Sequence, residues 1–253
     1  ASFTMTDDGL NASPAQANSN PGFSDISIYA MAANTGLFSW VNQIGGTNGE
    51  TCGDLISDAG SLYLVGNYNT QIIPPGLGAI PGTASEDVFL LALNNTLGTG
   101  QWIDLSPTVG MTNAVGKSMV QASAGNIWFV TEFEGIINIG GAAMEGSSGA
   151  KDLAVVEYNN LGAYQTHYVV KSIGDIYCHD IDVDATDEFY LGGSSTANST
   201  FGPHVTTVGG LLDGYTAKLG GCDASFSYSS ATYCTGNPNE TPTITGDAGG
   251  TFT

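Results

Sequence analysis

The stretch Asp87-Val-Phe-Leu-Leu-Ala-Leu93, followed by a turn at Gly98 and by Trp102, decides the fold of this chain. A short apolar run rich in large side chains and bounded by turn residues is typical of a buried β-strand. The same pattern, an Asp that opens an apolar or alternating run before a Gly-containing turn, recurs along the chain. Its copies start at Asp25, Asp87, Asp152 and Asp213, at spacings of 62, 65 and 61 residues. Such steady spacing indicates an internal repeat.

A second pattern lies between these runs and predicts a β-hairpin in each repeat. Apolar and β-branched residues flank a short Asp/Ala/Gly or Ala/Thr/Asp connection that reverses the chain. The three copies are Leu55 to Gly66, Val120 to Thr131 and Ile181 to Gly193, and their aromatic residues are Tyr63, Trp128 and Tyr190. A fourth strand is expected after each Asp-headed run, at Phe38 to Ile44, Gln101 to Leu105 and Tyr164 to Val170. No segment has a convincing helical period.

One repeat therefore holds about four short antiparallel strands, and such a unit must stack on copies of itself to cover its apolar faces. We predict an all-β fold of the β-propeller type, with four-stranded antiparallel blades and a ring of four blades. The predicted propeller-like domain spans 1–221, with repeats at 25–86, 87–151 and 152–212 and a partial copy at 213–221. The Gly-, Pro- and Thr-rich stretches 70–85, 135–150 and 194–210 are expected to be variable loops where binding could reside.

The first repeat supplies only two strands, so its blade is incomplete. We expect strands from Ala1 to Thr6 or from the tail at Thr241 to Thr253 to complete it and to close the ring. The alternative is that the missing strands belong to an upstream region or to a neighbouring subunit.

Composition excludes several classes of partner. The chain of 253 residues has 24 acidic residues, four lysines and no arginine, for a formal net charge of -20. Nucleic acids and anionic membranes are bound through Lys and Arg, so neither is expected as a partner. No apolar run is long enough to cross a bilayer, so direct membrane insertion is not expected. The acidic charge is read as keeping an extracellular protein soluble, with cation binding as the alternative.

The four cysteines predict an oxidising compartment. Cys52, Cys178, Cys222 and Cys234 form no C-x-x-C pair and have no zinc-like spacing with the histidines. Cys222 and Cys234 lie close in sequence and are predicted to form a disulfide. For Cys52 and Cys178, both a bond across the axis and two free buried thiols remain open.

Two groups of carboxylates are candidates for chemistry. Asp180, Asp182, Asp184 and Asp187 alternate near a turn and could offer hard oxygens to calcium, the one cofactor considered. The competing interpretation is that they form a hairpin turn and surface charge. Glu132 and Glu134 alternate like glycosidase carboxylates, but a solvated strand face is the favoured interpretation. Because no nucleophile elbow, zinc helix or phosphate loop is present, we predict no enzyme activity.

The repeat resembles a bacterial β-propeller repeat of exported surface proteins. The resemblance is carried by Gly60-Ser-Leu-Tyr63-Leu-Val-Gly66, by the Asp87 run with Gly98 and Trp102, and by Ile44-Gly45-Gly46 after Trp40. It covers residues 25 to 220 and departs from the family in the third copy, which lacks the Trp. The tail 222–253 is similar to the start of the immunoglobulin-like repeats of very large Bacteroidetes surface proteins, which are associated with type IX secretion and adhesion.

These resemblances imply a secreted, non-catalytic structural or adhesive module of a cell-surface protein. Its expected partners are other surface-protein modules or subunits, and glycans. The first alternative is a glycan- or calcium-binding propeller, recognisable by exposed aromatic residues or ordered carboxylates in the long loops. The second is an extracellular carbohydrate-active hydrolase, recognisable by a deep pocket in which carboxylates converge.

Overall fold

The computed structural model describes residues 23–219 except 59, 142 and 149, together with 226–227 and 243–244. This part of the chain is all-β and contains no helix, as predicted. The strands are β1 Ile26–Met31, β2 Phe38–Gly46, β3 Thr51–Ser57, β4 Ser61–Ile73, β5 Ile80–Asn94, β6 Gly100–Ser106, β7 Thr108–Gln121, β8 Ile127–Ile139, β9 Ala143–Gly146, β10 Asp152–Tyr158, β11 Tyr164–Ser172, β12 Ile176–Val183, β13 Phe189–Ser195, β14 Ser199–Phe201, β15 His204–Val205, β16 Asp213–Leu219, β17 Phe226–Ser227 and β18 Thr243–Ile244.

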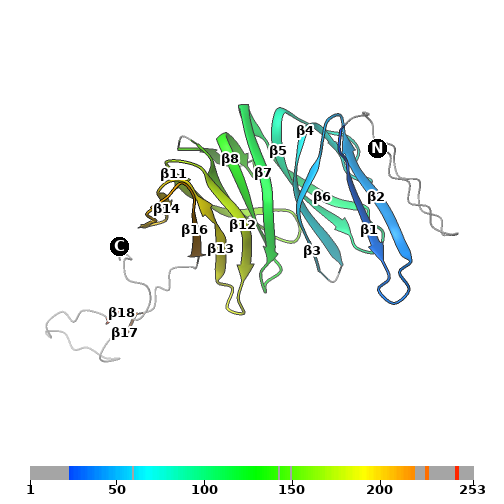
Figure 1. Cartoon of the computed structure of the whole chain (residues 1–253). Helices are drawn as coiled ribbons and strands as arrows, with labels where there is room; N and C mark the ends of the chain where they lie inside the picture. The colour runs from blue at the N-terminus through cyan, green and yellow to red at the C-terminus, as the bar shows by residue number, and fades with distance from the viewer. Residues whose placement is uncertain are drawn as a thin grey trace, which may run out of the picture.

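The strands form four successive units along the molecule (Figure 1). Unit 1 is β1–β2, unit 2 is β3–β4–β5–β6, unit 3 is β7–β8–β10–β11 with β9 beside β8, and unit 4 is β12–β13–β16. The pairs inside each unit are antiparallel. The strands of units 1 to 3, with β14 and β15, are linked into one sheet of 13 strands, and unit 4 is a separate sheet.

The predicted hairpins are confirmed as β3–β4, β7–β8 and β12–β13. Tyr63, Trp128 and Tyr190 occupy the second strand of the three hairpins, as expected from the repeat. The first strand of each hairpin also has a register shift at the same place, at Gly53, Lys117 and His179. A one-residue bulge of this kind bends a strand and increases its twist. The bulge is a repeated feature that the apolar pattern did not reveal.

Neighbouring units are joined by short main-chain ladders. The chain at the end of the outer strand of one unit lies against the extended second strand, or the loop, of the next. Gly46 of β2 pairs with Ile72 of β4, and Ser172 of β11 pairs with Ser199 of β14. Thr108, which follows β6 and begins β7, pairs with Ile137 of β8. The stretches expected to be loops are therefore partly strand, and that expectation was wrong. Their backbone gains hydrogen-bonding partners from another unit, which local composition does not reveal.

The apolar core lies between the units in three clusters. The first includes Ile28 and Ile44 of unit 1 with Leu64 of unit 2. The second joins units 2 and 3 through residues such as Tyr63 and Phe129, and the third joins units 3 and 4 around Trp128, Val155, Ile181 and Leu191. Successive side chains of a strand point to opposite faces of the sheet. Units 2 and 3 therefore each contribute to two clusters, one on each face.

The two ends of the array differ from its middle. Within the described residues β1 pairs only with β2, and β16 pairs only with β13. The tail strand β18 pairs with β17, not with unit 1. Residues 1–6 and the rest of the tail, including Cys222 and Cys234, lie outside the described residues, so the disulfide remains a prediction. In the described part of the chain no helix is long and apolar enough to cross a membrane.

Candidate functional site

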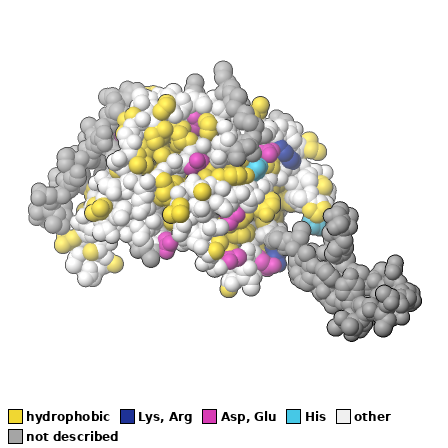
Figure 2. Space-filling model, turned by 180° about the vertical axis from the view of Figure 1, so that it is seen from behind, with side chains coloured by type: hydrophobic (Ala, Val, Ile, Leu, Met, Phe, Trp, Pro, Cys, Tyr) yellow, Lys and Arg dark blue, Asp and Glu magenta, His cyan; other side chains and the backbone are white. Residues whose placement is uncertain are grey.

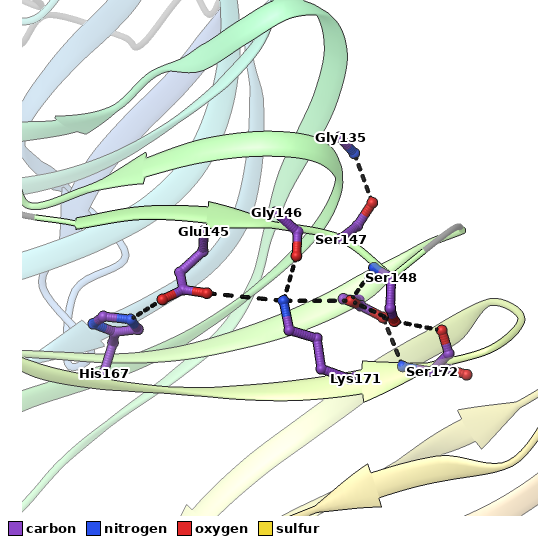
Figure 3. Close-up of polar contacts among 9 residues, drawn as sticks. Gly135, Glu145, Gly146, Ser147, Ser148, His167, Lys171 and Ser172 are labelled. Atoms are coloured by element: carbon purple, nitrogen blue, oxygen red, sulfur yellow. Dashed lines mark hydrogen bonds and ion pairs between the residues drawn. The ribbon is translucent and has the colours of Figure 1, made fainter.

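A partly exposed polar cluster lies on unit 3, where β9 meets β11 (Figure 3). The carboxylate of Glu145, on β9, lies 3.1 Å from Nε2 of His167, on β11. Its other oxygen lies 3.8 Å from Nζ of Lys171. Lys171 also donates to the Gly146 carbonyl and lies 4.0 Å from the buried Asp152 carboxylate. An acid, an imidazole and an amine at this spacing are the groups used in general acid–base catalysis.

The contacts of His167 indicate a structural role for this cluster. The Tyr164 hydroxyl lies 2.6 Å from His167 Nδ1. Burial and the charge of Glu145 raise the pKa of Tyr164. The Glu145 carboxylate lies 3.1 Å from Nε2. Both ring nitrogens are thus engaged by the protein, and the cluster fastens β9 to β11.

Glu132 is the centre of a second polar cluster, between units 3 and 4. It is 3% exposed, so the expectation of a solvated face was wrong for this residue, whereas Glu134 is exposed. Lys117 and Lys151 lie 3.5 Å and 3.3 Å from its two oxygens, and the amide of Cys178 donates to it at 3.0 Å. The alternating strand pattern could not show that Lys117 of β7 and Lys151, just before β10, neutralise Glu132.

Every lysine of the chain is engaged in an ion pair. Besides Lys117 and Lys151, Lys171 pairs with Glu145, and Lys218 pairs with Glu188 at 2.6 Å. In Figure 2 the dark blue lysine atoms that are visible lie beside acidic side chains. The described surface therefore offers no lysine free of a carboxylate partner to hold an anionic ligand.

The Asp that opens each repeat is a structural anchor in the middle of the molecule. Asp87 is fully buried and accepts four hydrogen bonds, from the amide and hydroxyl of Thr83 and from the amide and hydroxyl of Thr108. Asp152 accepts from the amide and hydroxyl of Ser148 and from the amide of Ser172. Each of the two carboxylates thus fastens the segment four residues before it to the chain at, or just after, the end of the outer strand.

The four aspartates predicted to bind calcium accept hydrogen bonds from different groups of the protein. Asp180 accepts from Ser118 Oγ at 2.9 Å, and Asp182 accepts from the Val183 amide at 2.8 Å. Asp184 accepts from Thr186 and Glu188 in the hairpin turn, which lowers its pKa to about 2, and Asp187 accepts from Ser123. Among the described residues no three Asp, Glu, His or Cys side chains gather as metal ligands. A calcium site here stays a prediction.

The two cysteines within the described range are free thiols. Cys52 is exposed and Cys178 is buried, so the structure favours the free-thiol alternative over a bond between them. Burial, followed by the charge of Glu132, raises the pKa of Cys178 to about 12. This thiol stays protonated at neutral pH and is a poor nucleophile.

Unit 1 contains a carboxyl pair that the sequence patterns did not single out. Glu50, just before β3, is 1% exposed and lies beside Asp25, just before β1. The positions equivalent to Glu50 in units 3 and 4 hold Ala114 and Ile176, both fully buried. Alignment of the repeats could therefore have revealed a carboxylate at an apolar position.

In comparisons with known proteins, neither a protein-family model nor a curated protein matches this chain.

Proposed function

We propose that this chain is a non-catalytic structural module of an extracellular surface protein, built as a propeller-like array of blades. The observation that carries the proposal is the repetition of one set of contacts at successive boundaries between units. Each boundary has an apolar cluster and a main-chain ladder at equivalent positions. Such a chain is organised to hold its units in a fixed order.

Two tryptophans add a side-chain link at the first two boundaries. Trp40 Nε1 donates to the Asn95 carbonyl at 3.0 Å, and Trp102 Nε1 donates to the Asn160 carbonyl at 3.2 Å. Each indole comes from the outer strand of one unit and reaches the turn between the third and fourth strands of the next. The link spans residues 55 and 58 positions apart in sequence, so it resists separation of the units.

The polar clusters support a structural role over catalysis. His167, Glu132, Asp87 and Asp152 are all engaged by groups of the protein itself. The paired lysines leave an acidic surface, which suits partners that present basic groups or bind through cations. We propose neighbouring modules or subunits as these partners, since both ends of the described array have a strand with a single partner.

The long stretches between second and third strands give little support to glycan binding. Sugar rings stack on exposed aromatic side chains, but the large apolar residues exposed in the described parts of these stretches are Ile136 and Val205. The exposed Tyr168 and Tyr190 lie on strands β11 and β13.

Single-molecule pulling from the two ends of the chain tests the structural proposal. A mechanically coupled array should unfold units 1 to 4 in one main event that releases roughly 650 Å of contour length, at about 3.3 Å per residue. A parallel assay with polysaccharide and ester substrates should give no turnover above a heat-denatured control. Independent unfolding of single units, or turnover that copurifies with the folded chain, would contradict the proposal.

A further inference from the structure

The carboxyl pair of unit 1 is built into the boundary between units 1 and 2. Glu50 is held by its main chain, since its amide donates to the Ser24 carbonyl at 2.8 Å and Ser24 Oγ donates to the Glu50 carbonyl at 3.2 Å. Asp25 Oδ2 accepts from Gln43 Nε2 of β2 at 2.6 Å. The pair is therefore placed by three different segments of the chain.

Two consecutive glycines of β2 face the two carboxyl groups. A Cβ added at Gly46 would lie 2.1 Å from the Gln71 carbonyl oxygen and 2.2 Å from Glu50 Oε1, so both the ladder to β4 and the Glu50 carboxyl require glycine there. A Cβ added at Gly45 would be in ordinary contact with the Asp25 carboxyl, at 3.4 Å. The positions equivalent to Gly46, just after β6 and at the end of β11, hold Thr108 and Ser172.

Several oxygens of this site are buried and receive no donor from any other group. They are Asp25 Oδ1, Gln43 Oε1 and both carboxylate oxygens of Glu50. The Asp25 and Glu50 carboxyl groups lie close enough to share a hydrogen bond with each other. Burial without a partner costs a charged oxygen several kcal/mol, so a native site normally supplies a donor or a cation. The four lysines are engaged at Glu132, Glu145 and Glu188 and cannot supply the charge.

The number of these oxygens distinguishes a proton from a metal ion. One proton shared by Asp25 and Glu50 satisfies one oxygen of each group and leaves the second Glu50 oxygen without a partner. A divalent cation can be coordinated by all three carboxylate oxygens and by the amide oxygen of Gln43. It also balances the negative charges of Asp25 and Glu50. Carboxylate and amide oxygens are the ligands of calcium, with water or main-chain carbonyls completing the coordination.

We propose that Asp25, Gln43 and Glu50 bind one calcium ion at the boundary between units 1 and 2. The ion stabilises this boundary, where none of the described residues gives the repeated aspartate a hydroxyl donor like those at Asp87 and Asp152. Burial, followed by repulsion from Asp25, raises the pKa of Glu50 to about 8, so without the ion the pair holds a proton near neutral pH. This site is separate from Asp180, Asp182, Asp184 and Asp187.

The test measures melting temperature and calcium binding on the full chain after removal of metal with a chelator. The melting temperature of the wild-type chain should rise as calcium is added. Calorimetry should find a calcium site in the wild type that is absent from Glu50→Gln. In Glu50→Gln the calcium dissociation constant should rise at least tenfold. The metal-free variant should melt no lower than the metal-free wild type, because the Gln side chain, like the protonated Glu50, is uncharged and can donate to Asp25. A merely structural role for Glu50 predicts the opposite, a lower melting temperature without calcium.

Asp182→Asn is the matched control, since it makes the same change in charge at an exposed aspartate and should leave calcium binding unchanged. Loss of the calcium effect in Asp182→Asn but not in Glu50→Gln would place the ion at the hairpin of unit 4 and overturn the proposal. Failure of the wild type to respond to millimolar calcium would also overturn it, in favour of a shared proton.

Discussion

Asp25 and Asp87 occupy the same place in successive repeats, yet their surroundings differ in a way that separates unit 1 from unit 2. Asp87 accepts hydrogen bonds from two amides and two hydroxyls, whereas among the described residues Asp25 accepts one from the Gln43 amide and lies within hydrogen-bonding reach of Glu50. The residue four positions before Asp25 is Pro21, which has no amide hydrogen, where Asp87 has Thr83. The same residue type is thus an anchor in one unit and half of a carboxyl pair in another.

The difference shows that the role of the repeated aspartate depends on which hydrogen-bond donors surround its carboxylate. Thr108 supplies both an amide and a hydroxyl to Asp87, but its equivalent in unit 1 is Gly46, which has no hydroxyl. Glu50 fills the space that Gly46 leaves. The glycine at position 46 therefore has two consequences at the boundary between units 1 and 2. Asp25 has no hydroxyl donor from this position, and the Glu50 carboxyl lies beside Asp25 instead.

The largest effect is expected when the two aspartates are replaced in parallel. Asp87→Asn places an amide against buried donors and should lower the free energy of unfolding by about 3 to 5 kcal/mol. Asp25→Asn should change the metal-free chain by less than about 1 kcal/mol, because it loses one bond but relieves repulsion from Glu50. Urea unfolding followed by circular dichroism measures both. Equal losses would show that the two sites are alike.

A second effect is the pH dependence of the metal-free chain. The pKa of Glu50 is raised from 4.5 to about 8 in the folded state, so between these values the folded chain binds more protons than the unfolded chain. Stability should fall as pH rises from about 5 to about 8, by at most about 1.4 kcal/mol per pH unit from this group. Asp25, whose pKa is also raised by burial, is the other titrating group that acts on Glu50.

Melting temperatures at several pH values, with a chelator present, measure this dependence. Glu50→Gln should remove most of it, and saturating calcium should oppose it because the ion binds the ionised pair. A wild-type curve that rises over this range would contradict the assignment of a protonated Glu50.

The smallest effect compares two turn glycines in the same conformation. Gly36 and Gly98 have φ values of +70° and +67°, but nothing lies within 4 Å of a Cβ added at Gly36, whereas one at Gly98 would meet the Trp40 ring and Asn42. Gly36→Ala should therefore cost about 1 kcal/mol for the left-handed backbone alone. Gly98→Ala should cost roughly 1 to 2 kcal/mol more, because it separates Trp40 from the neighbouring turn. Equal losses in urea unfolding would show that the Trp40 contact contributes little to the boundary.

Local pattern predicted the strands well and the connections poorly. The hairpin around Tyr63 and the run from Asp87 follow from short apolar segments bounded by turns, and the structure confirms both. The strand segment up to Ile73 was missed because its partners, Gly45 and Gly46, lie in another unit. The segment from Ile80 was missed because it pairs with that same part of β4. The burial of Glu132 was missed because Lys117 on β7 and Lys151, just before β10, reach it from elsewhere in the chain.

The sequence by itself determined the all-β class, the repeat of 61 to 65 residues and the scarcity of cations, because these depend on residue type and order along the chain. Only the tertiary structure decided which carboxylates are anchors, which are neutralised and which are left as a pair. That decision depends on donors brought together from distant strands, such as Thr108 to Asp87 and Gln43 to Asp25. A buried charge is stable or costly according to these partners, and spacing in sequence does not specify them.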